Sequence, residues 1–199
     1  MEENHEIELA WQVIENTGTH LFLTGKAGTG KTTFLRLVTG YLEPQKGRIE
    51  IASKKLSKWQ KKSFRRRIAS VFQDSLLIAG TIRDNITLKN INYTETEIME
   101  AIRLSGADSI IKRMPEGLEY HIGCDGGGLS GGERQKIAIA RALIRKPDIL
   151  IFDEVTNHLD YESRIRVKKL LVQMRGQKTI FLVSHDPDLI KLSDQEICL

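Results

Sequence analysis

The sequence predicts an α/β fold in which a mostly parallel β-sheet is flanked by helices. Short apolar runs alternate with helical segments along the 199 residues, a pattern typical of parallel strands joined by crossover helices. The middle of the chain differs, because residues 81–129 are mostly helical. We therefore expect a single domain, with a core α/β lobe made of residues 1–80 and 130–199 and a helical subdomain at residues 81–129 inserted into it.

Six short apolar segments are predicted to form buried strands. They are residues 20–24, 48–51, 68–72, 149–152, 179–183 and 196–199. Three helix starts are predicted from capping boxes, in which Ser or Thr is followed three residues later by Glu or Gln. They are residues 57–60, 94–97 and 130–133.

The composition narrows the classes of protein to which the chain can belong. No run approaches 18 consecutive apolar residues, so we expect no membrane-spanning helix. The first ten residues lack the basic and apolar regions of a secretory signal. The two cysteines, Cys124 and Cys198, have no metal-ligand spacing, which fits a reducing compartment such as the cytoplasm. A net charge of +4 mildly favours anionic partners.

A glycine-rich loop lies between the first predicted strand and a predicted helix at residues 33–38. Backbone N–H groups of such a loop, together with the helix N-terminus, bind phosphate. We expect Lys31 to neutralise the β- and γ-phosphates and the Thr32 hydroxyl to coordinate Mg²⁺. The loop fits G-x-x-x-x-G-K-[ST] and predicts a P-loop NTPase. The expected nucleotide-binding residues are Gly25, Lys26, Ala27, Gly28, Thr29, Gly30, Lys31, Thr32 and Thr33.

Two adjacent carboxylates follow the buried strand predicted at residues 149–152. Asp153 is expected to reach the Mg²⁺ shell through Thr32 or water, and Glu154 to polarise the attacking water as a general base. Acids are also common at helix N-termini for electrostatic reasons alone. The presence of the P-loop in the same chain favours the catalytic interpretation.

A second helix start is made accessible by glycines. Ser130 can donate to a phosphate oxygen, while Gly131 and Gly132 leave the first N–H groups of the helix open. The same residues form a capping box, which is a purely local helix start. Because the P-loop already cradles one nucleotide, we interpret this second surface as half of a site shared between two chains.

From about residue 37 to residue 199 the sequence closely resembles the ATP-binding cassette (ABC) family. The P-loop corresponds to the Walker A motif, Gln73 to the Q-loop glutamine and His185 to the switch histidine. The remaining motifs are the signature at residues 129–133, Walker B at 149–154 and the D-loop at 157–160. The resemblance implies ATP hydrolysis with Glu154, His185 and Gln73 as catalytic residues. It also implies Mg²⁺ bound near Thr32, Gln73 and Asp153.

Residues 79–86 and 114–118 resemble the nucleotide-binding domains of ABC exporters. The resemblance implies a head-to-tail dimer in which Ser130, Gly131 and Gly132 of one copy complete the ATP site of a second nucleotide-binding domain. It further implies transmembrane domains of an exporter as partners, and a cytoplasmic position at the inner face of the cell membrane. Nucleic acid is not expected as a partner.

The sequence departs from this family at several positions. The antiparallel β-subdomain that normally precedes the P-loop is largely missing ahead of Gly25. Trp11 is a candidate for the aromatic residue that stacks on adenine, but it equally fits an anchor on a buried helix face. Cys124 replaces a usual Glu, and Asn157 and His158 replace a usual pair of small residues in the D-loop.

Two alternative functions remain open. Residues 9–36 resemble the ATP site of DNA helicases, and the run at residues 54–67 contains eight Lys and Arg, which together suggest a DNA-dependent ATPase. Such basic runs are more often solvated helix faces, and the downstream helicase motifs are missing. The second alternative is a non-catalytic nucleotide-binding fragment.

Overall fold

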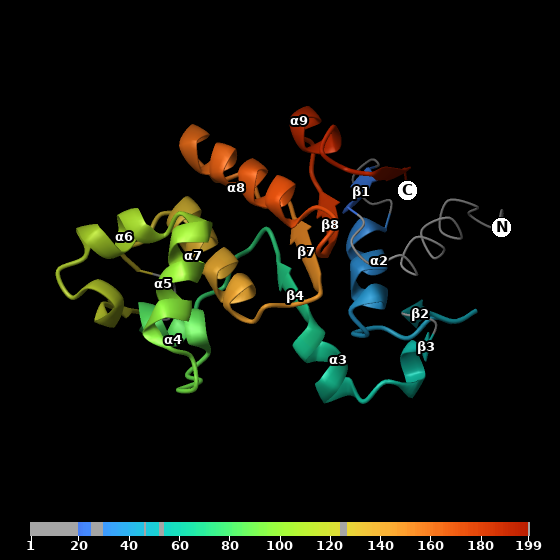
Figure 1. Ribbon diagram of the computed structural model, residues 1–199, viewed down its shortest axis with the longest axis horizontal. Helices are drawn as coiled ribbons and strands as arrows, with labels where there is room; N and C mark the ends of the chain where they lie inside the picture. Colours follow the sequence, from blue (N-terminus) through green and yellow to red (C-terminus); the bar gives the residue numbers. More distant parts are fainter. Residues whose placement is uncertain (1–19, 25–29, 46, 52–53, 124–126, 199) are drawn as a thin grey trace. The chain divides into compact units, whose positions relative to one another are not determined.

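The computed structural model of the chain describes residues 20–24, 30–45, 47–51, 54–123 and 127–198 (Figure 1). A five-stranded sheet has the order β4-β7-β8-β1-β9. The pairings of β1 with β8, β1 with β9 and β7 with β8 are parallel. The bounds are β1 His20–Thr24, β4 Ile68–Val71, β7 Ile149–Asp153, β8 Thr179–Val183 and β9 Gln195–Cys198.

The chain forms two compact units. The first contains Met1–Ala69, Pro147–Glu154 and Leu171–Leu199, and the second contains Ser70–Lys146 and Val155–Leu170. The boundaries of the core lobe and helical subdomain predicted from the sequence stay a prediction.

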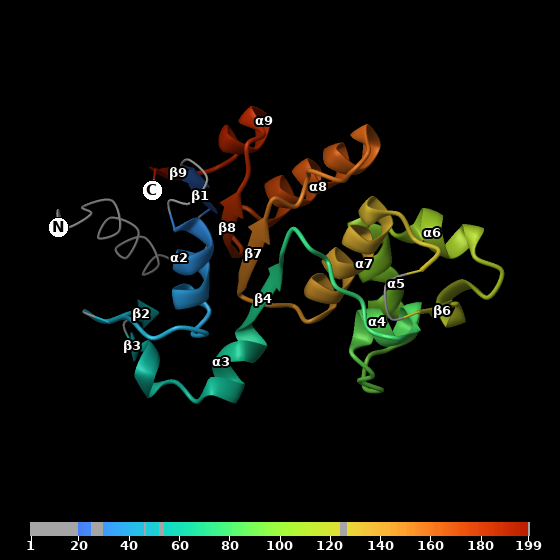
Figure 2. The ribbon, with the colours of Figure 1, turned by 180° about the vertical axis from the view of Figure 1, so that it is seen from behind.

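The first unit is built around the central strands β7 and β8, in which every residue except Asp153 is buried. Both Phe152 on β7 and Phe181 on β8 have no exposed surface. Helix α2 (Lys31–Val38) places Phe34, Leu35 and Val38 in a buried cluster that includes Phe181, and Figure 2 shows α2 beside β1 from the opposite side. The other described elements are β2 Glu50–Ile51, β3 Lys54–Lys55, η1 Leu56–Lys58, α3 Lys61–Arg67 and α9 Pro187–Ile190.

The second unit is mostly helical, with α7 packed against α4 and α5 (Figure 1). Helix α7 is a 14-residue helix with a nearly continuous buried face, including Ile137, Ala140 and Ile144. The elements are β5 Gly80–Thr81, α4 Ile82–Thr87, α5 Glu95–Ser105, α6 Asp108–Arg113, η2 Gly117–Glu119, β6 His121–Ile122, α7 Gly131–Ile144 and α8 Tyr161–Met174, which continues into the first unit.

Most of the predicted elements are confirmed. The strands at residues 20–24 and 179–183 are observed with the predicted bounds, and those at 68–72, 149–152 and 196–199 differ by one residue. Capping boxes are present at Thr94 and Ser130. Among the described residues, no helix is both long enough and apolar enough to cross a bilayer.

Two local predictions are wrong. The strand at residues 48–51 is reduced to β2, which pairs antiparallel with β3 in a separate two-stranded sheet. The capping box at residues 57–60 does not start a helix. Residue Trp59 is extended (φ −81°, ψ 138°), and α3 begins at Lys61. The Trp59 ring instead packs on Phe64, with 5.9 Å between centroids, so tertiary packing overrides the local helix signal.

Candidate active site

The described end of the P-loop has the backbone conformation of a tight turn into a helix. Gly30 precedes α2 with φ 95° and ψ 8°, a left-handed conformation that glycine adopts without steric cost. Its carbonyl oxygen accepts the first helical hydrogen bond, from Phe34 N–H, at 2.8 Å. Lys31 is half-buried and Thr33 is exposed, while the structure gives only the backbone of Thr32. The residues Gly25, Lys26, Ala27, Gly28 and Thr29 lie outside the described part of the chain.

The two Walker B carboxylates lie at the carboxyl end of β7, where Asp153 is in register with Val183 of β8. Glu154 follows with φ 52°, which is rare for a residue other than glycine. Its N–H donates to the Val183 carbonyl oxygen at 2.8 Å, and the residue is 8% exposed. Strained, well-packed backbone of this kind clusters at functional sites.

His185 approaches Glu154 from the end of the neighbouring strand. Its Nε2 lies 3.4 Å from Glu154 Oε1, and the imidazole is 73% exposed while the Glu154 side chain is 11% exposed. Ser184 is buried, and its Oγ accepts the N–H of Asp186 at 3.1 Å. These contacts hold the chain on either side of His185, leaving its ring accessible to a ligand beside the carboxylate.

The charges around Asp153 suit a cation. Burial raises the pKa of the Asp153 carboxyl, the neighbouring Glu154 charge raises it further, and the positive charge of Lys31 lowers it. Among the described residues no group of three His, Cys, Asp or Glu side chains is placed to hold a metal. Mg²⁺ is commonly held by one or two carboxylates plus substrate phosphates, and Asp153 is a candidate for such a carboxylate.

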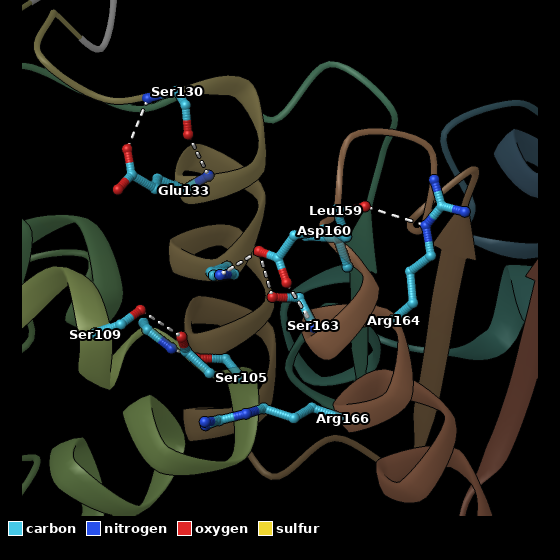
Figure 3. Close-up of polar contacts among 12 residues, drawn as sticks. Ser105, Ser109, Ser130, Glu133, Leu159, Asp160, Ser163, Arg164 and Arg166 are labelled. Atoms are coloured by element: carbon cyan, nitrogen blue, oxygen red, sulfur yellow. Dashed lines mark hydrogen bonds and ion pairs between the residues drawn. The ribbon is translucent and has the colours of Figure 1, made fainter.

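The signature residues of the second unit begin α7. Ser130 N–H donates to Glu133 Oε2 at 2.8 Å, and Glu133 N–H donates to Ser130 Oγ at 3.3 Å (Figure 3). Ser130 is exposed, and Gly131 and Gly132 are half-buried. The residues thus form the capping box that local sequence predicts and also leave this end of the helix accessible.

Gln73 is exposed and shares a groove with Gly131 rather than being isolated on the surface. It lines a groove of about 490 Å³ in the second unit. The groove is lined by Gln73, Asp74, Ser75, Leu76, Leu77, Gly131, Arg134 and His158.

The segment that follows Gln73 is anchored by a buried amide. Asn85 has no exposed surface, and its side chain accepts from Ile78 N–H at 2.8 Å and donates to the Ile78 carbonyl at 2.9 Å. Arg141 of α7 donates to the Asn85 side-chain oxygen at 2.8 Å and to the Leu76 carbonyl at 2.9 Å. The sequence did not predict that Asn85 and Arg141 hold this segment, because these hydrogen bonds join residues that are not neighbours in the sequence.

The predicted site residues fall into two described groups. Lys31, Asp153, Glu154 and His185 belong to the first unit, and Gln73, Ser130, Gly131 and Gly132 belong to the second. Their contacts with nucleotide and metal stay predictions. Trp11 and Cys124 lie outside the described residues. Sequence reasoning missed Lys136, because it ends a polar run that starts at Glu133 and so gives no local sign of burial.

The chain matches a family model described as ABC transporter over residues 12–157. It is 36% identical over 182 residues to a toxin RTX-I translocation ATP-binding protein of Actinobacillus pleuropneumoniae, covering 92% of this chain and 26% of the relative. It is 39% identical over 183 residues to the ABC multidrug transporter mdr2 of Aspergillus fumigatus, covering 92% of this chain and 23% of the relative. The chain thus spans about a quarter of the length of these relatives.

The fold is also that of a solved transporter. A structure of a bacterial Atm1-family ABC exporter with ATP bound matches with a TM-score of 0.86 and 31% sequence identity, over 92% of this chain and 32% of the other. The parallel five-stranded sheet with flanking helices agrees with this match. The chain belongs to the ABC transporter family, of which it is an ATP-binding domain.

Proposed function

We propose that this chain hydrolyses ATP to power an ABC exporter. The observation that carries the proposal is the placement of Glu154, a mostly buried carboxylate with left-handed backbone, next to Asp153 and 3.4 Å from His185. A carboxylate, a second carboxylate for a metal and an accessible imidazole are groups that can serve phosphoryl transfer to water.

Each residue has a distinct role in this reaction. Gly30, Lys31 and the rest of the P-loop bind the phosphates, Glu154 accepts a proton from the attacking water, and His185 orients Glu154 and contacts the γ-phosphate. Asp153, Thr32 and Gln73 would hold Mg²⁺, which when bound neutralises charge on the phosphates. The pairing of two carboxylates, with Asp153 partly buried, supports a cation at this place.

A second copy of the domain completes the site. The start of α7 combines an exposed Ser130 with two glycines, so that it can meet phosphate on another chain. Head-to-tail pairing would then place ATP between the Walker A motif of one copy and Ser130, Gly131 and Gly132 of the other. ATP would hold the two copies together until it is hydrolysed.

The partners follow from the exporter resemblance. The names of similar proteins include a toxin translocation protein and a β-(1→2)-glucan export ATP-binding/permease protein of Agrobacterium vitis. The chain is 37% identical to the second protein over 182 residues, and the match covers 31% of that protein. We infer that this domain works against the transmembrane domains of an exporter at the cytoplasmic inner face of the cell membrane.

The test is ATP turnover by the purified chain with Mg²⁺. Glu154→Gln should lower the rate by about 10²-fold or more, as expected when a general base is lost, and should trap an ATP-bound dimer in sedimentation experiments. Glu100→Gln, at an exposed position of α5, is the matched control and should hydrolyse ATP at the unsubstituted rate. Equal turnover by Glu154→Gln would remove Glu154 from this role.

A DNA-dependent ATPase is the second candidate, because all eight Lys and Arg of residues 54–67 are exposed. The one Trp in this run is already covered by cations. Lys54 and Arg67 lie 5.0 and 5.3 Å from its ring centroid, so the ring already makes cation–π contacts. Stimulation of turnover by DNA, with a steep salt dependence, would support this candidate over the exporter.

A further inference from the structure

A nearly buried lysine joins the signature helix to the D-loop. Lys136, on α7, is 9% exposed, and its Nζ donates to Asp160 Oδ2 at 3.0 Å. Lysine is rarely buried unless its ammonium is paired, because removing the charge from water is costly. Among the described residues, Asp160 is the carboxylate within ion-pair distance of Lys136. Lys136 is therefore the buried member of the pair, whereas the Asp160 side chain is 60% exposed.

Asp160 is itself held in a fixed orientation. It precedes α8, and its side chain accepts from Ser163 N–H at 2.8 Å and from Ser163 Oγ at 2.9 Å (Figure 3). These two hydrogen bonds, with the charge of Lys136, hold the pKa of Asp160 well below its usual range. The carboxylate is therefore ionised at neutral pH and links the start of α8 to α7.

The turn before Asp160 lies directly on the first turn of α7. A Cβ added at Gly132 would lie 2.6 Å from the His158 carbonyl oxygen, and one added at Gly131 would lie 3.8 Å from His158 Cβ. On the other side of the turn, Arg164 Nε donates to the Leu159 carbonyl oxygen at 3.1 Å (Figure 3). His158, which is exposed, and Gly131, which is half-buried, both line the groove that contains Gln73. Any partner that reaches Gly131 there also meets His158.

We propose that Lys136 is a positioning residue: through Asp160 it holds residues 157–160 against the start of α7. His158 and the two glycines then present one preformed surface to the nucleotide of a second copy. This inference rests on the proposed function, since it concerns the surface at which two copies would meet. Lys136 acts through Asp160 and contacts neither nucleotide nor metal.

Two substitutions remove the ion pair by different routes. Lys136→Met removes the charge and keeps the length of the side chain. Asp160→Asn removes the opposite charge, while its amide oxygen can still accept from Ser163 N–H and cap α8. The matched control is Lys146→Met, which makes the same chemical change in the exposed pair of Lys146 Nζ with Glu97 Oε1, 2.7 Å apart. Lys136→Arg restores a cation at the first position.

The experiment measures ATP-driven association of the full chain, in the Glu154→Gln background, by sedimentation velocity. Binding of a fluorescent ATP analogue to dilute monomer and thermal unfolding are measured on the same samples. Lys136→Met and Asp160→Asn should each weaken association about tenfold or more, a size typical of small displacements of binding groups. Nucleotide affinity of the monomer should stay within about twofold, because the Walker A and Walker B residues are unchanged.

The control and rescue variants complete the test. Lys146→Met should associate like the unsubstituted chain, Lys136→Arg should recover most of the loss, and the double variant should be no weaker than the weaker single variant. Unchanged association of Lys136→Met and Asp160→Asn would overturn the inference and leave the proposed function intact. Loss of monomer nucleotide binding in parallel with association would also overturn it, by showing general destabilisation. If the Glu154→Gln chain, with no further substitution, does not self-associate when ATP is added, both this inference and the proposed function are contradicted.

Discussion

His185 Nε2 lies 3.4 Å from Glu154 Oε1, although the two residues are far apart in the sequence. The contact exists because β7 and β8 are adjacent parallel strands, with Asp153 in register with Val183. Their carboxyl ends therefore meet at one edge of the sheet, which is where open α/β sheets bind ligands. The imidazole is largely exposed and the carboxylate is largely buried, so the histidine can contact both a ligand and Glu154.

Substitution of His185 should affect turnover more than nucleotide binding. We expect His185→Ala to lower kcat for ATP by about 10²-fold, the loss typical for one positioned polar group in an active site. The Kd for ATP should change by less than about threefold, because the P-loop provides most of the phosphate contacts. Steady-state kinetics and equilibrium binding separate the two effects. His121→Ala, at an exposed position of β6, is the control, and an equal loss in that variant would contradict the assignment.

Asp153 should reduce stability when neither Mg²⁺ nor nucleotide is bound. Burial and the Glu154 charge raise its pKa, so its contribution to stability is complete below the ordinary Asp pKa and is lost as the pH rises through the raised value. Asp153→Asn should therefore unfold at a higher temperature than the unsubstituted chain at pH 7. Its free energy of unfolding should be higher by about 0.5–1 kcal/mol after solvent screening. The difference should shrink as the pH falls through the raised pKa and vanish below the ordinary Asp pKa, where the carboxyl is protonated in both the folded and the unfolded chain.

Thermal unfolding across this pH range checks the sign of the effect. The same variant should also lose ATP turnover, because the expected metal ligand is gone. A lower unfolding temperature for Asp153→Asn at pH 7 would show that the carboxylate is stabilised in the fold, contrary to its environment.

Gly132 should tolerate no side chain, whereas Gly131 should. A Cβ at Gly132 would meet the His158 carbonyl oxygen at 2.6 Å, while at Gly131 its nearest atoms would be 3.8 Å away. Gly132→Ala should therefore lower the free energy of unfolding by about 1–3 kcal/mol, as overpacking against backbone does. Gly131→Ala should cost less than about 1 kcal/mol. Urea denaturation compares the pair directly, and equal costs would show that the turn at His158 yields easily.

Glu97 should stabilise α5 in two separable ways. Its carboxylate pairs with Lys146 and also completes the capping box with Thr94, and these contacts lower its pKa to about 2. Because the pKa is lowered, this contribution is present above the ordinary Glu pKa and is lost as the pH falls through about 2. Glu97→Gln keeps the cap and should unfold at a higher temperature than Glu97→Ala at pH 7. Below pH 3 the unsubstituted chain should approach Glu97→Gln. If Glu97→Gln already unfolds at the same temperature as the unsubstituted chain at pH 7, the ion pair with Lys146 adds nothing to the cap.

Local sequence rules succeeded where the physical cause is itself local. The capping boxes at Thr94 and Ser130 need only a hydroxyl and a carboxylate three residues apart, and both are present. The same rule failed at Ser57, because the ring of Trp59 packs on Phe64 and the chain extends at this point. The rule also missed the capping box at Thr81, where Asp84 takes the place of the expected Glu or Gln.

The amino-acid sequence by itself determined the α/β class, most of the strands, the P-loop and the order of the motifs, because residue type and spacing set these properties along a continuous stretch of chain. The tertiary structure alone decided which distant groups meet: His185 with Glu154, and Lys136 with Asp160. Such pairs depend on strand register and on the turn at residues 157–160 packing against α7. These properties result from burying apolar surface of the whole fold.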